Sequence, residues 1–238
     1  MGVRKNQKNL TTAEWAKFTN AIDATHGVGA AAPAYRSFVS VHVDAMTAAH
    51  MNWEVHTMMM GGMTMRGVNF LTWHRRFLKL FEERLQQVDP SITIPYWNSV
   101  ADRAIPAPLA NAALLTKWSV TRSWDASQLA SQASLNAVIG FGGTFTEFQT
   151  ALEGSVHAAT HNAVGGHMAG ASSPTDPVFW LHHSFIDKIW ADWQASPNGK
   201  NPPGTAKKLK PTNLVAGVPF GVKVSYLLQI SKIGRAHV

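Results

Sequence analysis

The chain has 238 residues, of which 15% are charged, and a formal net charge of +7. This length favours one large domain with a sizeable core. The low share of charged residues, together with nine Trp and eleven Phe, excludes a disordered chain. The absence of cysteine excludes disulfides, thiolate metal sites and cysteine nucleophiles.

No segment has the pattern of a membrane span or an export signal. No apolar run reaches the ~18 residues that a spanning helix needs, and no apolar stretch follows the basic residues of the N-terminus. We therefore expect no membrane partner, and a location in the cytoplasm or export by a route that the sequence does not show. Basic residues cluster only near the ends, at 4–8 and 207–210. We expect solvated termini there rather than a nucleic-acid footprint, and hence no nucleic-acid partner.

Three helices are predicted in the first half of the chain. Thr12 as N-cap and an apolar stripe predict a helix over 11–24, and a second helix is predicted over 34–50. A Gly/Met-rich loop at 57–68 precedes the strongest helix, at 69–88, whose apolar residues recur at helical spacing.

Two further helices are predicted in the second half, at 145–162 and 178–194. Residues 92–97 predict a short extended segment, and 98–142 a loop-rich stretch with short helical turns. The tail ends in a possible strand at 221–230.

The predicted fold class is mainly α. We expect a helical bundle core with long loops and a possible short β element near the C-terminus. The whole chain, 1–238, is expected to form a single domain, with a core over about 12–195 and a tail over 196–238.

Histidines fall on the apolar faces of the predicted helices. His42, His74 and His183 each share such a face with apolar residues, and His157 and His161 are four residues apart on one face. A lone histidine there is usually a hydrogen-bonded core residue, but burying five together is costly unless something satisfies them. Imidazole binds zinc, copper, iron and nickel. With no cysteine and few inward carboxylates, the set fits copper best and predicts a two-metal site in the bundle core.

The residues around these histidines resemble the tyrosinase family, most closely its short bacterial members. The resemblance runs from about Tyr35 to Trp193. It is carried by Phe70-Leu71-Thr72-Trp73-His74-Arg75, by Pro95-Tyr96-Trp97, by Leu152-Glu153-Gly154 with the histidine pair and Val164-Gly165-Gly166-His167-Met168, and by Asp176-Pro177-Val178-Phe179-Trp180-Leu181-His182-His183 with Asp187.

The resemblance implies two copper ions in a helical bundle, each held by three histidines, that use O2 to oxidise phenols or catechols to o-quinones. Carried over by matching position, copper B is held by His157, His161 and His183, and copper A by His42 and His74. His182 is expected to face elsewhere and not to bind copper, either as a structural residue or as a support for the ligands.

The third copper A ligand is where the chain departs from the family. The family places a histidine nine residues before the position of His74, where this chain has Met65. His56 and His50 are the candidate replacements. We favour His56, because it lies in a loop with the reach to approach His74, whereas His50 would sit ~12 Å beyond His42 along a straight helix. Met65 stays open as a third candidate, since a thioether suits Cu(I).

A second departure concerns proton removal from the substrate. Family members that hydroxylate monophenols often have Asn directly after the first copper B ligand, where it orients a water together with a Glu. Here that position is Ala158, and Glu153 is the counterpart of the Glu. Asn162 follows the second ligand and is either a partial substitute or a helix-end residue. These three are the predicted catalytic positions. Asp187, four after His183, either accepts a proton from a ligand imidazole or pairs with a neighbouring arginine.

We expect a dicopper oxidase of o-diphenols with some activity on monophenols. Its partners would be O2 and a small phenolic or catecholic substrate, and a copper-delivery partner is left open. The alternatives are a haemocyanin-like O2-binding protein without significant catalysis and a zinc hydrolase, which would need carboxylate ligands that the motifs do not offer.

Overall fold

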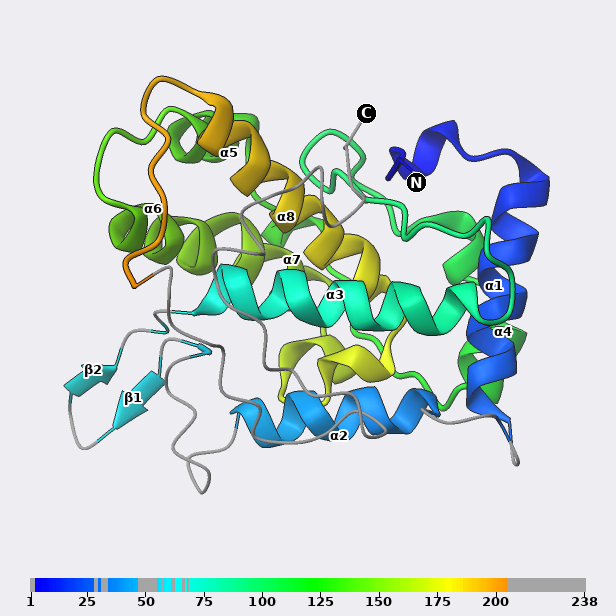
Figure 1. Ribbon diagram of the computed structural model, residues 1–238. Coiled ribbons are helices and arrows are strands. Elements are labelled where there is room, and N and C mark those ends of the chain that lie inside the picture. Colours follow the sequence, from blue (N-terminus) through cyan, green and yellow to red (C-terminus); the bar gives the residue numbers. More distant parts are fainter. Residues whose placement is uncertain are drawn as a thin grey trace.

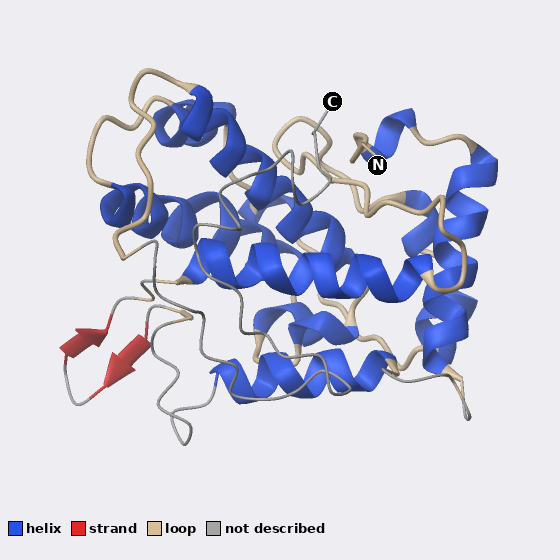
Figure 2. Ribbon diagram, viewed as in Figure 1, coloured by secondary structure: helices blue, strands red, loops and turns tan. Residues whose placement is uncertain are grey.

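The computed structural model describes residues 3–27, 30, 34–46, 55–56, 58–60, 63–65, 67 and 69–204, with the backbone alone at 58–60 and 63–65. Within these residues the chain is mainly helical, as predicted (Figure 1, Figure 2). The predicted strand at 221–230 lies outside them. No helix in the described part is long and apolar enough to cross a lipid bilayer.

The first half of the chain forms three helices and a hairpin: α1 Thr12–His26, α2 Tyr35–Met46, β1 Met58–Met60, β2 Met63–Met65 and α3 Phe70–Gln86. Helix α1 covers Thr12–His26 where 11–24 was predicted, and its N-cap is Thr11 rather than the predicted Thr12. The Thr11 hydroxyl accepts from the Glu14 backbone N–H, and the Glu14 carboxylate accepts from the Thr11 backbone N–H. This capping box satisfies two donors at the helix start.

The Gly/Met-rich segment is not all loop. Strands β1 and β2 pair antiparallel, with Met58 opposite Met65 and Met60 opposite Met63. The prediction of a loop over 57–68 is therefore wrong at these strands, where the two backbones satisfy each other's polar groups.

The stretch between 98 and 142 contains short helical turns, as predicted. They are η3 Ala107–Leu109, α4 Ala112–Lys117, η4 Ala126–Gln128 and α5 Gln132–Ile139. The segment 92–97 is extended without joining a sheet in the described part, apart from a parallel bridge between Asn6 and Tyr96.

The helix predicted over 145–162 is interrupted by a π-turn. Helix α6 (Phe145–Leu152) runs into a single π-helical turn, η5 (Glu153–His157), and continues as α7 (Ala158–Val164). Such turns insert an extra residue into a helix and frequently occur at functional sites. The chain then passes through η6 (Gly166–Ala169) and η7 (Ser173–Thr175) into α8 (Val178–Ala195).

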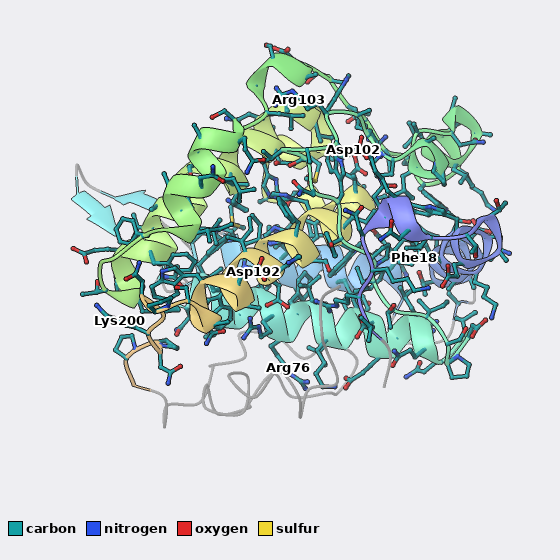
Figure 3. All side chains as sticks on the ribbon, turned by 90° about the horizontal axis from the view of Figure 1, so that it is seen from above. Phe18, Arg76, Asp102, Arg103, Asp192 and Lys200 are labelled. Atoms are coloured by element: carbon teal, nitrogen blue, oxygen red, sulfur yellow. The ribbon has the colours of Figure 1, made fainter. Side chains whose placement is uncertain are left out.

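Helices α3 and α8 lie side by side at the centre of the molecule, with α2 along the other side of α3 (Figure 1, Figure 3). Trp180 of α8 stacks on Phe81 of α3 with ring centroids 3.8 Å apart. The Trp180 indole N–H donates to the Tyr35 hydroxyl of α2 at 2.9 Å. All three rings are buried, so an aromatic cluster fixes the three helices relative to one another.

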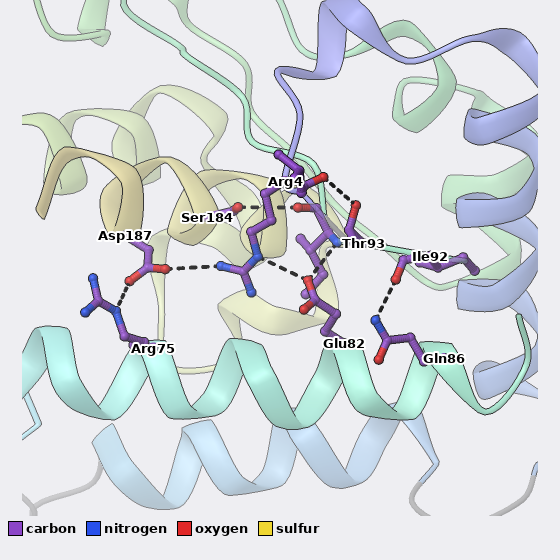
Figure 4. Close-up of polar contacts among 10 residues, drawn as sticks. Arg4, Arg75, Glu82, Gln86, Ile92, Thr93, Ser184 and Asp187 are labelled. Carbon is purple, nitrogen blue, oxygen red and sulfur yellow. Dashed lines mark hydrogen bonds and ion pairs between the residues drawn. The ribbon is translucent and has the colours of Figure 1, made fainter. Parts of the chain in front are cut away.

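The N-terminus is anchored inside this framework by Arg4, which is fully buried. Its guanidinium donates to Glu82 of α3 at 3.1 Å and to Asp187 of α8 at 3.2 Å, and Arg75 of α3 also donates to Asp187 (Figure 4). The prediction of a solvated terminus is therefore wrong at Arg4. Two buried carboxylates require buried positive partners, and Arg4 supplies one of them.

Candidate metal centre

Three histidines from three separate segments form a first group, pocket A. They are His42 of α2, His56 before β1 and His74 of α3. One ring nitrogen of each lies within 4.8 Å of those of the other two, and all three side chains are buried. Pocket A contains the histidine favoured by sequence as the third copper A ligand. His50 lies outside the described residues, and of Met65 only the backbone is described.

Four histidines form a second group, pocket B. His157 closes the π-turn, His161 lies one turn on in α7, and His182 and His183 lie side by side in α8. Their candidate ligand atoms also lie within 4.8 Å of one another. The prediction that His182 faces elsewhere is wrong in this respect. It is completely buried, and its ring lies 5.4 Å from that of His157 and 5.0 Å from that of His161, where the π-turn packs against α8.

Backbone carbonyl oxygens hold four of these rings by their Nδ1 atoms. The pairs are His42 with Ala171 at 2.7 Å, His74 with Phe70 at 2.8 Å, His157 with Glu153 at 3.2 Å and His161 with Met168 at 2.6 Å. A carbonyl oxygen only accepts, so each Nδ1 carries the proton. In a neutral imidazole the lone pair is then on Nε2, which is the tautomer a metal ligand requires.

The Nε2 atoms that result are buried and unsatisfied. Those of four rings have no hydrogen-bond partner among the described residues, namely His42, His56, His74 and His157. The Nε2 atoms of His161 and His183 face each other at 3.3 Å. Buried polar atoms are normally paired, and a set of converging imidazole lone pairs in which no carboxylate or thiolate takes part is a donor set for copper. The residues of both pockets therefore fit a dinuclear copper centre.

Burial keeps six of these imidazoles neutral, namely those of His42, His74, His157, His161, His182 and His183. The pKa values of His74, His157 and His183 lie well below their ordinary value. Burial away from water is the larger cause, and repulsion from the neighbouring imidazoles is the smaller one. Burial likewise lowers the pKa values of His42 and His182, and lowers that of His161 to about 4. At neutral pH the rings are in the form that binds metal.

The two pockets touch. The His74 ring lies parallel to the His183 ring, with centroids 4.2 Å apart and an interplanar angle of 8°. Phe179 packs against His183 at 4.2 Å and against His42 at 5.1 Å. The pockets therefore form one centre, walled on one side by an aromatic ring.

Asp187 is the centre of a buried ion-pair group between α3, α8 and the N-terminus. It accepts from Arg75 and Arg4, which confirms the salt bridge with Arg75 among the alternatives left open by the sequence. Its contribution is to fix α8 against α3, and thus His183 against His74.

The three predicted catalytic positions lie at the two ends of α7. Glu153 and Ala158 flank the π-turn and Asn162 is near the helix end. The Glu153 carboxylate is buried, and its Oε1 lies 3.3 Å from the Nδ1 atom of His56. Ala158 is half-buried and Asn162 is exposed. Of these three positions, it is the Glu153 side chain that lies against a clustered histidine in the described part of the chain.

Several residues that shape the centre were missed by sequence reasoning. Arg4 carries no pattern that separates it from a surface residue. Ala171 and Met168 act through backbone carbonyls, so their side chains give no signal. Gly165 and Gly166 do give a sequence signal, because consecutive glycines allow positive φ, here 62° and 54°. They turn the chain so that the Met168 carbonyl reaches His161.

Comparison with known proteins gives the family. The model of the common central domain of tyrosinase matches residues 32–118 and 107–196. A tyrosinase from Streptomyces lincolnensis is 32% identical over 238 positions, which cover 82% of this chain and 83% of the relative.

Two solved structures share the fold. A functional unit of octopus hemocyanin matches with a TM-score of 0.75 and 23% identity, over 100% of this chain and 68% of that chain. Polyphenol oxidase from Thermothelomyces thermophila matches with a TM-score of 0.70 and 16% identity, over 100% and 89%. Since the domain model spans the segments that carry both histidine pockets and the bacterial relative covers most of the chain, this protein belongs to the tyrosinase family of copper oxidoreductases.

Proposed function

We propose that this protein uses O2 to oxidise o-diphenols to o-quinones, and hydroxylates monophenols more slowly. The observation that carries the proposal is the convergence of six imidazole Nε2 atoms in two adjoining pockets, His42, His56 and His74 for copper A and His157, His161 and His183 for copper B. Two bound copper ions supply the redox couple that passes electrons from the diphenol to O2. Two diphenols give up four electrons and four protons, so the products are two quinones and two waters.

The protein's part is to hold the ligands and to admit the substrate. Carbonyl contacts fix the ring orientations before metal arrives, so little rearrangement is needed on binding. His161 is only half-buried, whereas the other five proposed ligands are buried, and it is followed by the exposed Asn162. We therefore expect the phenol to approach from the side of His161.

The preference for diphenols follows from the proton that must be removed. A monophenol has a pKa of ~10, so its binding as phenolate needs a base. The Glu153 carboxylate already lies against His56, and position 158 has no amide that could hold a water beside it. Deprotonation of a monophenol should therefore be the slower process.

An O2-binding protein of the hemocyanin kind is the second candidate, supported by the match to the octopus functional unit. One experiment separates the two functions. The copper-loaded protein is mixed with catechol, and O2 uptake and quinone absorbance are followed together. An oxidase consumes one O2 for every two quinones formed, whereas reversible O2 uptake without quinone would contradict the proposal. A matched monophenol in the same assay gives the ratio of the two activities.

A further inference from the structure

His56 occupies a place that the family fills from a different position, and the structure shows what holds it there. It lies between α2 and β1, outside any helix or strand, yet its side chain is only 6% exposed. Its Nε2 atom is buried without a hydrogen-bond partner among the described residues, and one of its ring nitrogens lies within 4.8 Å of a ring nitrogen of His42 and of His74. A histidine outside regular structure needs other contacts to hold that position.

The first contact is the close approach of Gly67 to the His56 backbone. A Cβ atom on Gly67 would lie 2.6 Å from the His56 carbonyl carbon and 2.7 Å from its Cα atom. Real Cβ atoms do not come so close to backbone, so position 67 accepts only glycine while His56 stays in place. Any side chain here would push His56 away.

Gly67 is in turn fixed to two helices. Its carbonyl oxygen accepts from the Phe70 N–H at the start of α3, at 3.1 Å, and from the Gln149 side-chain amide of α6. The side-chain Oε1 atom of Gln149 accepts from the Leu71 backbone N–H at 3.2 Å. One buried amide thus joins α6, the first turn of α3 and the glycine that supports His56.

The second contact comes from Glu153, one helical turn after Gln149. Its carboxylate lies 3.3 Å from the His56 Nδ1 atom, and its backbone carbonyl accepts from the Nδ1 atom of His157 at 3.2 Å. A carboxylate that accepts a hydrogen bond from the Nδ1–H fixes the tautomer with the lone pair on Nε2. Glu153 therefore touches one imidazole in each pocket, through two different groups.

We infer that Glu153 is a positioning residue whose carboxylate orients His56 as the third ligand of copper A, while Gly67, held by Gln149, sets the place of its backbone. The inference rests on the proposed copper A site. It assigns to the Glu153 carboxylate a task in pocket A, whereas the family resemblance gives it a task in proton removal from the substrate. The π-turn is the local feature that brings the carboxylate toward His56 and the carbonyl toward His157.

The test measures copper retained per chain, after loading and dialysis against a chelator of graded strength. We expect two ions in the wild-type protein. Glu153→Ala should retain about one, with copper A weakened ~10–100-fold, the usual effect of losing a partner of a ligand imidazole. Copper B should remain, because the backbone carbonyl that holds His157 is unchanged. Glu153→Gln should restore most of the binding of the second copper ion, since its amide oxygen accepts the same hydrogen bond from the His56 Nδ1–H.

A second variant tests the same idea without altering a carboxylate. Gly67→Ala should also retain about one copper ion, because the methyl group displaces His56. Gly142→Ala is the matched control, since a Cβ atom there meets nothing within 4 Å. Glu83→Ala, which removes an exposed carboxylate, is the control for Glu153→Ala. Both controls should retain two ions, and the helical circular dichroism signal identifies any variant that has not folded.

Retention of both copper ions by Glu153→Ala, with wild-type affinity, would overturn the inference. The same holds if Glu153→Ala loses copper and Glu153→Gln does not recover it. A wild-type protein that binds two ions but leaves catechol unchanged would contradict the proposed function instead, and the copper counts of the variants would still decide the role of Glu153.

Discussion

The imidazole of His74 lies parallel to that of His183, with ring centroids 4.2 Å apart. His74 belongs to α3 and His183 to α8, so the distance between the two pockets is set by the packing of these helices. That packing is locked by the stack of Trp180 on Phe81 and by the ion pairs of Asp187. The spacing of the proposed copper ions is therefore a property of the bundle rather than of a loop.

His183→Ala should bind about one copper ion per chain and lose oxidase activity by at least ~100-fold, because pocket B loses one of its imidazoles. Its helical circular dichroism should stay close to that of the wild type. His167→Ala is the matched control, because His167 lies outside both groups. Full copper content in His183→Ala would argue that His182 serves as the ligand.

Ala158→Asn should raise the monophenol rate relative to the diphenol rate, by roughly tenfold if it restores a water-orienting amide beside Glu153. Paired initial rates on a monophenol and its catechol measure the ratio. Asn162→Ala serves as the comparison variant, because Asn162 is exposed. It should change the ratio of the monophenol rate to the diphenol rate less than Ala158→Asn does. An unchanged ratio in Ala158→Asn would mean that the proton leaves by another path.

The third ligand of copper A can be tested directly. His56→Ala should lose about one copper ion and nearly all oxidase activity, since only two imidazoles of pocket A remain. Met65→Leu should keep both ions and most of the rate. The opposite pattern, with copper lost from Met65→Leu alone, would show that the family position is used here with a thioether.

Arg4→Met should destabilise the fold by ~3 kcal/mol, because it leaves two buried carboxylates, Glu82 and Asp187, short of a positive partner. Urea unfolding of the metal-free protein measures the free energy. Lys5→Met is the matched control, since the Lys5–Glu14 pair is exposed, and should change stability by less than ~0.5 kcal/mol. Equal effects would mean that the terminus is not held as the structure indicates.

The stability of the metal-free protein should fall as the pH drops below about 6.5. Burial lowers the folded-state pKa of His42, His74, His157, His182 and His183, and lowers that of His161 to about 4. Between the unfolded pKa and the folded pKa, the unfolded chain takes up protons that the folded chain does not, so each such histidine costs up to ~1.4 kcal/mol per pH unit. Urea midpoints between pH 5 and 8 measure the slope. A flat profile in the metal-free protein would contradict neutral burial.

The sequence alone determined the helical class and named all six proposed ligands, five by their place in the motifs and His56 by the reach of its loop. The stripes of α3 and α8 are strongly periodic, and periodicity reports which side of a helix is buried without reference to its neighbours. The spacing of His157 and His161 places both on one face in the same way. The sequence also gave the family, because its motifs lie in continuous segments.

Only the tertiary structure decided the features that depend on contacts between distant segments. The burial of Arg4 results from two carboxylates 78 and 183 residues away, a relation with no local pattern. The location of His182 inside pocket B depends on how the π-turn packs against α8. The support of His56 by Gly67, Gln149 and Glu153 joins a loop to two helices through a glycine, an amide and a carboxylate. Hydropathy and spacing describe one segment at a time, whereas these residues acquire their roles only when the segments meet.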